Sequence, residues 1–239
     1  MLTVDYDRLY LEPGMAVLDL GAGFGRHAFE SARRGARVVA ADFAFNEMES
    51  TRSTFAAMID AGELDEGTTH VGCTQADGLG LPFANNSFDR IIASEILEHV
   101  PDDLGVMTEL CRVLKPGGII AATVPATLPE QICWWLDDGY HAPKVVGGHV
   151  RIYTRAELTT KLESVGLEPT EYHRAHALHS PYWWLKCAVG VTNDSHPLVR
   201  LYLRFLTWDI VKAPRITRLA DRILNPVLGK SLVQYAVKA

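Results

Sequence analysis

The stretch Val17-Leu-Asp-Leu-Gly-Ala-Gly-Phe-Gly25 decides the fold of this chain. It joins a mostly apolar run to three alternating glycines, and Arg26 to Arg34 then follow with a helical pattern. This order predicts a buried parallel strand, a tight turn and the start of a helix. Because Gly21 and Gly23 have no Cβ, the backbone there can approach a ligand closely, and the helix start offers unpaired N–H groups to it.

Asp42 is the second decisive residue. It closes another apolar run, Val38-Val-Ala-Ala41, about twenty residues after the glycines, where doubly wound folds place an acid on ribose hydroxyls. The glycines, however, are spaced as Gly-x-Gly-x-Gly and not as the dinucleotide fingerprint GxGxxG. The spacing therefore disfavours a nicotinamide-dependent oxidoreductase, which we keep as an alternative.

Strand patterns alternate with helix patterns along most of the chain. We expect strands at 16–20, 37–41, 71–74, 90–94, 119–124, 167–175 and 231–238, and helices at 26–34, 46–61, 102–114 and 154–165. Lys115-Pro-Gly-Gly118 is expected to form a turn, and Thr154 with Glu157 a capping box. The pattern predicts an α/β, doubly wound, Rossmann-like fold with a seven-stranded, mainly parallel sheet and a C-terminal helical insertion, about 180–229, before the last strand.

Composition narrows the class of protein. The 239 residues are 48% hydrophobic and 22% charged, as in an ordinary globular domain, and the net charge of -6 argues against a general nucleic-acid binder. The four cysteines form no CxxC pair and indicate reduced thiols. We find no signal peptide and no apolar run long enough to span a membrane, so a cytoplasmic location is expected.

Two later segments complete a family pattern. They are Leu81-Pro-Phe-Ala-Asn-Asn-Ser-Phe-Asp-Arg-Ile-Ile-Ala-Ser-Glu95 and Arg112-Val-Leu-Lys-Pro-Gly-Gly118. Together with the glycines and Asp42, they resemble class I S-adenosylmethionine (SAM)-dependent methyltransferases of type 11, the group that includes quinone-biosynthesis methyltransferases. The resemblance covers residues 12–175 and implies one domain over 1–239, with a SAM-binding half (1–124) and an acceptor-side half (125–239).

The resemblance implies a SAM site at the carboxyl ends of the first four strands. Asp42 would bind the ribose diol, Asp77 the adenine amino group and Ser94 the methionine amino group. From the residues alone, Asp42 could equally cap a helix and Asp77 could be a turn residue. The cofactor-binding residues that the resemblance implies are Asp19, Gly21, Ala22, Gly23, Asp42, Phe43, Asp77, Gly78, Leu79 and Ser94.

The segment Glu95-Ile-Leu-Glu-His99 is open to two interpretations. Its side chains either line the pocket without a metal, which we favour, or Glu95, Glu98 and His99 hold Mg²⁺, as implied by quinone-pathway O-methyltransferases with a similar segment.

Methyl transfer to a hydroxyl requires removal of a proton, and a positioned histidine can accept it near neutral pH. The candidates for this base are His149 and His141, with His99 third. Each of them could instead only hold a loop by a hydrogen bond. Arg151 and Tyr153 are candidates to bind a polar acceptor. O-methylation is favoured, C- and N-methylation stay open, and a methyltransferase-like protein that binds SAM without turnover is the further alternative.

The region 180–230 is basic and rich in aromatic residues. It carries eight Lys and Arg against three Asp, so it is about +5 while the rest of the chain is about -11. Such a region is typical of an amphipathic segment that contacts anionic lipid. We favour a helical lid packed on the sheet over the active site, which is compatible with membrane contact, and a homodimer interface stays open. We therefore expect a small-molecule or lipid acceptor and a cytoplasmic enzyme with peripheral membrane contact as one possibility.

Overall fold

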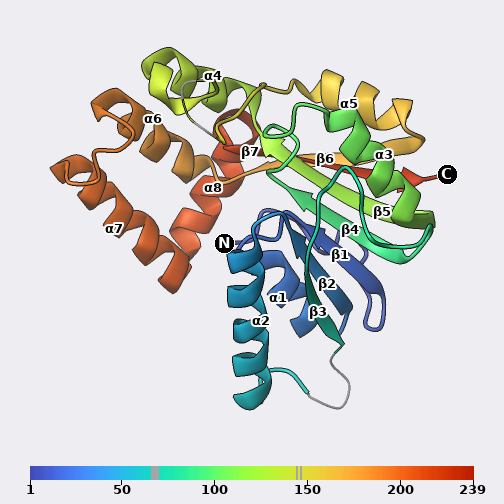
Figure 1. Ribbon diagram of the computed structural model, residues 1–239. Helices are drawn as coiled ribbons and strands as arrows, with labels where there is room; N and C mark the ends of the chain where they lie inside the picture. The colour runs from blue at the N-terminus through green and yellow to red at the C-terminus, as the bar shows by residue number, and fades with distance from the viewer. Residues whose placement is uncertain (66–69, 144, 146) are drawn as a thin grey trace.

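A seven-stranded sheet forms the centre of the molecule (Figure 1). The computed structural model describes residues 1–65, 70–143, 145 and 147–239. The strand order is β3-β2-β1-β4-β5-β7-β6, and only β7 runs antiparallel, pairing with β5 and β6. The strands are β1 (Ala16–Leu20), β2 (Arg37–Asp42), β3 (Val71–Gln75), β4 (Phe88–Ser94), β5 (Leu114–Pro125), β6 (Leu167–Ala175) and β7 (Ser231–Lys238). This order confirms the predicted doubly wound, mainly parallel fold.

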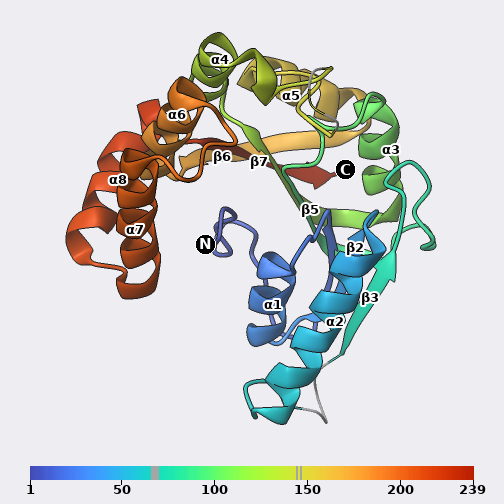
Figure 2. The same ribbon diagram turned by 60° about the vertical axis from the view of Figure 1, so that its left-hand side comes forward.

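Helices cover both faces of the sheet. α1 and α2 bury their apolar side chains on one face with Val17 of β1, whereas α3 and α5 pack on the other face with Leu18 (Figure 2). Successive strand residues point to opposite faces, so one buried strand supports both layers. The helices are α1 (Arg26–Arg33), α2 (Phe45–Asp60), α3 (Asp103–Val113), α4 (Thr127–Leu136), η1 (Asp138–Tyr140), α5 (Arg155–Ser164), η2 (Ala177–His179), α6 (Ser180–Val189), α7 (Pro197–Lys212) and α8 (Arg215–Leu228).

The structure corrects one local expectation, the turn at 115–118, and adds one helix that the sequence did not predict, α4. The turn expected at Lys115–Gly118 is wrong, because β5 runs through it without a break from Leu114 to Pro125. The strand is irregular there, because its pairing register with β4 shifts between Phe88 and Arg90. Gly117, with φ of 72°, permits this irregular backbone. Helix α4 was not predicted at all, although it supplies part of the candidate site.

The helical insertion is confirmed as three helices between β6 and β7. α6, α7 and α8 extend from the β6 side of the sheet, well away from α1–α3 (Figures 1 and 2). The insertion begins and ends at one place, because Ala175 of β6 and Ser231 of β7 are paired in register. None of the helices in the described part of the chain has the length and apolarity needed to cross a bilayer.

Candidate active site

The glycine turn after β1 has a backbone conformation that favours glycine. Gly21, Gly23 and Gly25 all have positive φ, at 68°, 53° and 79°. A Cβ on Gly21 would lie 2.0 Å from Cγ2 of Ile96, in the loop after β4. Glycine is therefore required at position 21 both for its φ and for the packing of Ile96. The sequence pattern identified the glycine but not the side chain that faces it.

One small cavity brings together half of the predicted cofactor residues. It measures about 210 Å³ and lies beside the glycine turn, at the carboxyl ends of β1 and β2. Ile96, Val100 and Val106 supply part of its apolar lining. The predicted residues among those that line it are Gly21, Asp42, Phe43, Asp77 and Gly78.

Asp42 and Asp77 use only part of their hydrogen-bonding capacity within the protein. The carboxylate of Asp42 accepts from the N–H groups of Gly23 and Ala44, both at 2.9 Å. Asp77 accepts from the N–H of Leu79 at 2.9 Å. Each carboxylate oxygen has a second lone pair, so both groups can still accept hydrogen bonds from a ligand. The structure thus allows the ribose and adenine roles while showing the turn role as well.

Asp19 and Ser94 lie just outside this cavity. The carboxylate of Asp19 is buried, neither of its oxygens has a hydrogen-bond partner in the part of the chain that the structure describes, and burial raises its pKa to about 7. Ser94 accepts from the guanidinium of Arg26 at 3.1 Å, and the same guanidinium donates to the carbonyl of Met1 at 3.2 Å. Arg26 is therefore a site residue that sequence reasoning missed, although a cation at the first position of the helix was visible there.

The remaining predicted cofactor residues do not line the cavity. Ala22 and Gly23 belong to the glycine turn, and the side chain of Leu79 is exposed beside Asp77.

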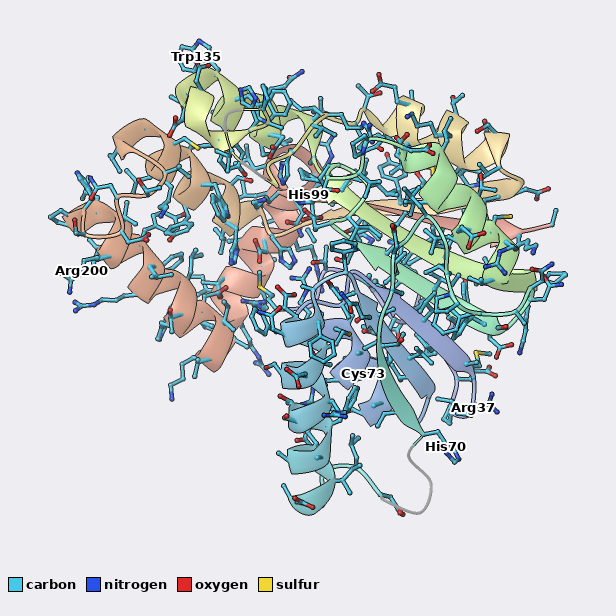
Figure 3. All side chains as sticks on the ribbon, viewed as in Figure 1. Arg37, His70, Cys73, His99, Trp135 and Arg200 are labelled. Carbon is cyan, nitrogen blue, oxygen red and sulfur yellow. The ribbon has the colours of Figure 1, made fainter. Side chains whose placement is uncertain are left out.

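A cluster of one carboxylate and two imidazoles adjoins the cavity. His99, labelled in Figure 3, lines the cavity. Its ring meets the ring of His149 edge-on, with centroids 4.7 Å apart. One potential ligand atom from each of Glu98, His99 and His149 lies within 4.8 Å of the others. The third predicted metal residue, Glu95, does not belong to this group, because its carboxylate accepts from Thr123 Oγ1 at 3.0 Å.

Glu98 is the most unusual member of this cluster. Its side chain is fully buried, and neither carboxylate oxygen has a hydrogen-bond partner among the described residues. Burial, reinforced by the negative charge of Glu95, raises the pKa of Glu98 well above its ordinary value. A bound proton or a bound cation would remove the penalty of this charge.

His149 is held by an acid that the sequence analysis did not identify. Its Nδ1 donates to the buried carboxylate of Glu130 on α4, which also accepts from Trp134 Nε1 at 2.8 Å. Burial alone would raise the pKa of Glu130, but the contacts to His149, with Trp134 and Lys230, outweigh it and lower the pKa. The bond at Nδ1 leaves Nε2 of His149 as the nitrogen with a free lone pair.

The backbone of His141 pairs with that of His149 in an isolated parallel bridge, but the His141 side chain does not join the His99–His149 ring pair. Its ring stacks on Trp134 with centroids 4.1 Å apart, and its Nδ1 bonds to the carbonyl of Ala142 at 2.8 Å. The neighbours of His149 are instead aromatic: Tyr140 lies 5.9 Å from its ring, and Trp183 of α6 lies 5.9 Å from Tyr140. The helical insertion therefore contributes a ring next to Tyr140, which in turn lies beside His149.

Arg151 and Tyr153 serve to hold loops together. The guanidinium of Arg151 donates to the carbonyls of Leu97, Val100 and Pro101. The hydroxyl of the buried Tyr153 donates to Asp103. These contacts fix the Glu98–His99 loop, so neither side chain is free to bind an acceptor.

Comparison with known proteins identifies the domain. A family model described as a methyltransferase domain matches residues 18–122. The sterol 24-C-methyltransferase of Yarrowia lipolytica is 32% identical over 232 residues, which are 93% of this chain and 55% of the relative. The ubiquinone biosynthesis O-methyltransferase of Dinoroseobacter shibae is 30% identical over 168 residues, 66% of this chain and 62% of the relative.

Solved structures agree on the fold. A SAM-dependent methyltransferase from Methanosarcina mazei matches with a TM-score of 0.63 at 17% identity, covering 98% of this chain and 97% of that one. At this identity the likeness shows the fold alone. The chain spans about half the length of the curated relatives it matches.

Proposed function

We propose that the protein transfers a methyl group from SAM to a small-molecule or lipid acceptor, because its residues 18–122 match a family model described as a methyltransferase domain. The observation that carries the proposal is the meeting of the cavity lined by Asp42 and Asp77 with the His99–His149 pair. The match to a methyltransferase domain gives no support to the oxidoreductase alternative.

The cavity and its surroundings fit the cofactor. Asp42 would accept from the ribose hydroxyls and Asp77 from the adenine amino group, through lone pairs that the protein leaves free. Arg26 and Ser94 are near enough to each other to bind the carboxylate and the amino group of the methionine end. When bound, SAM supplies a methyl group on a sulfonium, so the protein has mainly to align the acceptor with it.

We further propose O-methylation with His149 as the general base. Glu130 holds the Nδ1–H of His149, so Nε2 can take the proton of an acceptor hydroxyl as the methyl group arrives. Tyr140 and Trp183 would flank that acceptor. This assigns residues 1–124 to the cofactor and residues 125–239 to the acceptor and its proton, within one domain.

The test uses SAM labelled on its methyl group. The purified protein is incubated with an extract of its source organism, and the products are divided between organic and aqueous phases. His149→Ala should lower the rate roughly 10²- to 10⁴-fold while the Kd for SAM stays unchanged. His70→Ala, an exposed histidine beside β3, is the matched control (Figure 3). A His149→Ala variant with the wild-type rate would refute the base, and SAM binding without any labelled product would favour the inactive alternative.

A divalent cation at Glu98, His99 and His149 is a second candidate, favoured by the unpartnered buried carboxylate of Glu98. Carboxylate and imidazole ligands suit Mn²⁺ or Zn²⁺ as well as Mg²⁺. The cation would polarise the acceptor hydroxyl directly. It would compete with the proton for the lone pair of His149, so the two mechanisms exclude each other. Loss of labelled product with EDTA, restored by one added metal, would select the metal mechanism; full activity in EDTA would select the base.

We also propose that α7 and α8 contact an anionic membrane surface. Their exposed apolar side chains are Leu198, Leu201, Leu203, Phe205, Trp208, Ile210 and Val211 on α7 and Ile216, Leu219, Ile223, Leu224 and Val227 on α8. Exposed cations such as Arg200, Arg204 and Lys212 lie among them, whereas Asp209 and Asp221 are buried. An outer face of apolar and cationic groups suits anionic headgroups above acyl chains.

A further inference from the structure

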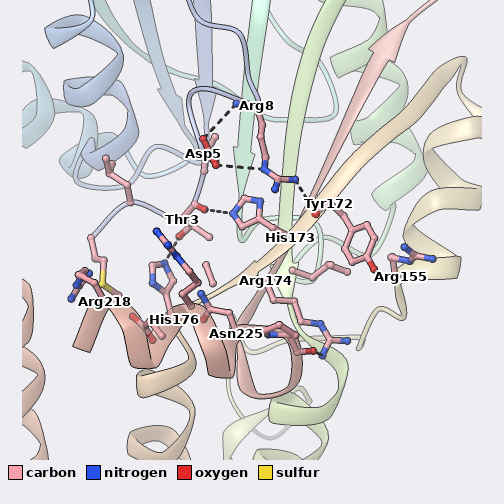
Figure 4. A pocket seen from close by; sticks show the side chains of 18 residues that line it. Thr3, Asp5, Arg8, Arg155, Tyr172, His173, Arg174, His176, Arg218 and Asn225 are labelled. Atoms are coloured by element: carbon pink, nitrogen blue, oxygen red, sulfur yellow. Dashed lines mark hydrogen bonds and ion pairs between the residues drawn. The ribbon is translucent and has the colours of Figure 1, made fainter. Parts of the chain in front are cut away.

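A large cleft lies between the N-terminal segment, β6 and α8 (Figure 4). Its volume of about 770 Å³ exceeds that of the cavity beside the glycine turn, and no residue lines both. Residues 1–5 form one wall, the second half of β6 another, and α8 a third. We call it the basic cleft, because five arginines but only two aspartates line it: Arg8, Arg155, Arg174, Arg218 and Arg222 against Asp5 and Asp221.

Two of these arginines already have carboxylate partners. Arg8 pairs with Glu171 at 2.9 Å and with Asp5 at 3.5 Å. Arg218 pairs with the buried Asp209. These two guanidinium groups are therefore neutralised by the protein itself.

The other three arginines have no such partner. Arg155 lies over the ring of Tyr172, 4.2 Å from its centroid, and Arg174 donates from one nitrogen to the carbonyl of Pro226 at 3.1 Å. Arg222 is exposed on α8. Within the described residues none of the three forms an ion pair. Asp221, which also lines the cleft, accepts the N–H of Leu178 at 3.1 Å and contributes one negative charge against them. Three unneutralised guanidinium groups around one cleft in a chain of net charge -6 are a local excess of positive charge.

The guanidinium groups of this lining indicate which class of ligand the cleft would bind. A phosphate presents three acceptor oxygens and close to two negative charges, whereas a carboxylate presents two oxygens and one charge. Three guanidinium groups with free N–H donors match the phosphate better. Val4, Ala175 and Leu232, which are largely buried, also line the cleft, so an organic group attached to the phosphate would meet apolar side chains there.

We propose that the basic cleft binds the phosphate group of an organic ligand through Arg155, Arg174 and Arg222. The inference stands on the cleft and does not depend on the proposed methyl transfer. Two sources offer the same chemistry: a soluble phosphorylated molecule and a phospholipid headgroup. They differ in whether a free phosphate suffices or a lipid is needed.

The test compares three forms of the full chain by thermal unfolding and by titration calorimetry. Arg155→Gln with Arg222→Gln removes two charges from the cleft and spares Arg174, whose bond to Pro226 holds α8. Arg37→Gln with Arg52→Gln removes two exposed charges from β2 and α2 and is the matched control; Arg37 is labelled in Figure 3. The probes are inorganic phosphate, and dihexanoyl phosphatidylglycerol and dihexanoyl phosphatidylcholine below their micelle concentrations. Chloride keeps the ionic strength constant.

We expect phosphate or phosphatidylglycerol to raise the Tm of the wild type and of the control by roughly 5 °C at a hundred times the Kd. The cleft variant should bind roughly tenfold more weakly or worse. A response to inorganic phosphate would identify a soluble ligand, and a response to phosphatidylglycerol alone would identify a headgroup. The proposal is overturned if neither probe binds, if phosphatidylcholine binds equally well, or if the control variant loses binding as the cleft variant does.

Discussion

Replacing Gly21 by Ala tests the central turn independently of any activity. An alanine at φ of 68° adopts a left-handed conformation, which costs about 1–2 kcal/mol. Its Cβ would also lie 2.0 Å from Cγ2 of Ile96, and relieving such an overlap costs about 1–3 kcal/mol. We therefore expect Gly21→Ala to lower the free energy of unfolding by roughly 2–5 kcal/mol.

Urea unfolding followed by circular dichroism measures this change, and a double-mutant cycle separates its two causes. Ile96→Ala removes Cγ2, so the double variant should recover about 1–3 kcal/mol relative to the sum of the single changes. Gly80→Ala is the control, because a Cβ there meets nothing within 4 Å and its φ is not left-handed. Additivity within about 0.5 kcal/mol, or equal effects at Gly21 and Gly80, would show that Ile96 does not fix the identity of residue 21.

Three further results are expected. Asp42→Ala should weaken SAM binding by roughly one to a few kcal/mol in calorimetry, and unchanged affinity in a folded variant would remove Asp42 from the site. Because burial raises the pKa of Asp19 from 3.8 to about 7, the folded state retains a proton that the unfolded state has lost between these values. Stability should therefore fall as the pH rises through that window, and Asp19→Asn should flatten the profile; an unaltered profile would contradict the assignment. Arg200→Gln with Arg204→Gln should lower partition onto phosphatidylglycerol vesicles roughly thirtyfold in co-sedimentation, because each charge contributes about 1 kcal/mol. If the variant instead loses dimerisation while its vesicle binding is unchanged, the outer face of α7 and α8 is an interface between copies of the chain.

The sheet could be predicted because its signals are local. Buried parallel strands are short apolar runs, and the capping box of Thr154 and Glu157 marks the start of α5 as observed. The segment Lys115–Gly118 was misjudged because proline and glycine are typical of turns, yet they also fit an irregular stretch of strand. Helix α4 was missed because its proline, its two tryptophans and its single acid, Glu130, give no clear helical period.

The site was predictable only where spacing fixes position. Asp42 and Asp77 follow strands, so their side chains had to reach the same edge of the sheet. The hydrogen bond between His149 and Glu130 joins a loop to a helix that was not predicted, and no local sequence pattern indicates it. The cysteines show the same limit, since Cys133 on α4 and Cys187 on α6 are far apart in sequence, yet the interaction with Cys187 raises the pKa of the Cys133 thiol.

Ala175 and Ser231 are direct partners in the β6–β7 ladder, although three helices separate them along the chain. The insertion therefore leaves and rejoins the sheet as the loop of a β-hairpin does. A two-residue turn at this point, or a different set of helices, would preserve every strand pairing and every residue of the cofactor cavity. The fold thus contains a position, between Ala175 and Ser231, at which a segment can be replaced without changing the sheet. A different set of helices could therefore be inserted there while residues 18–122, which match the methyltransferase family model, are retained.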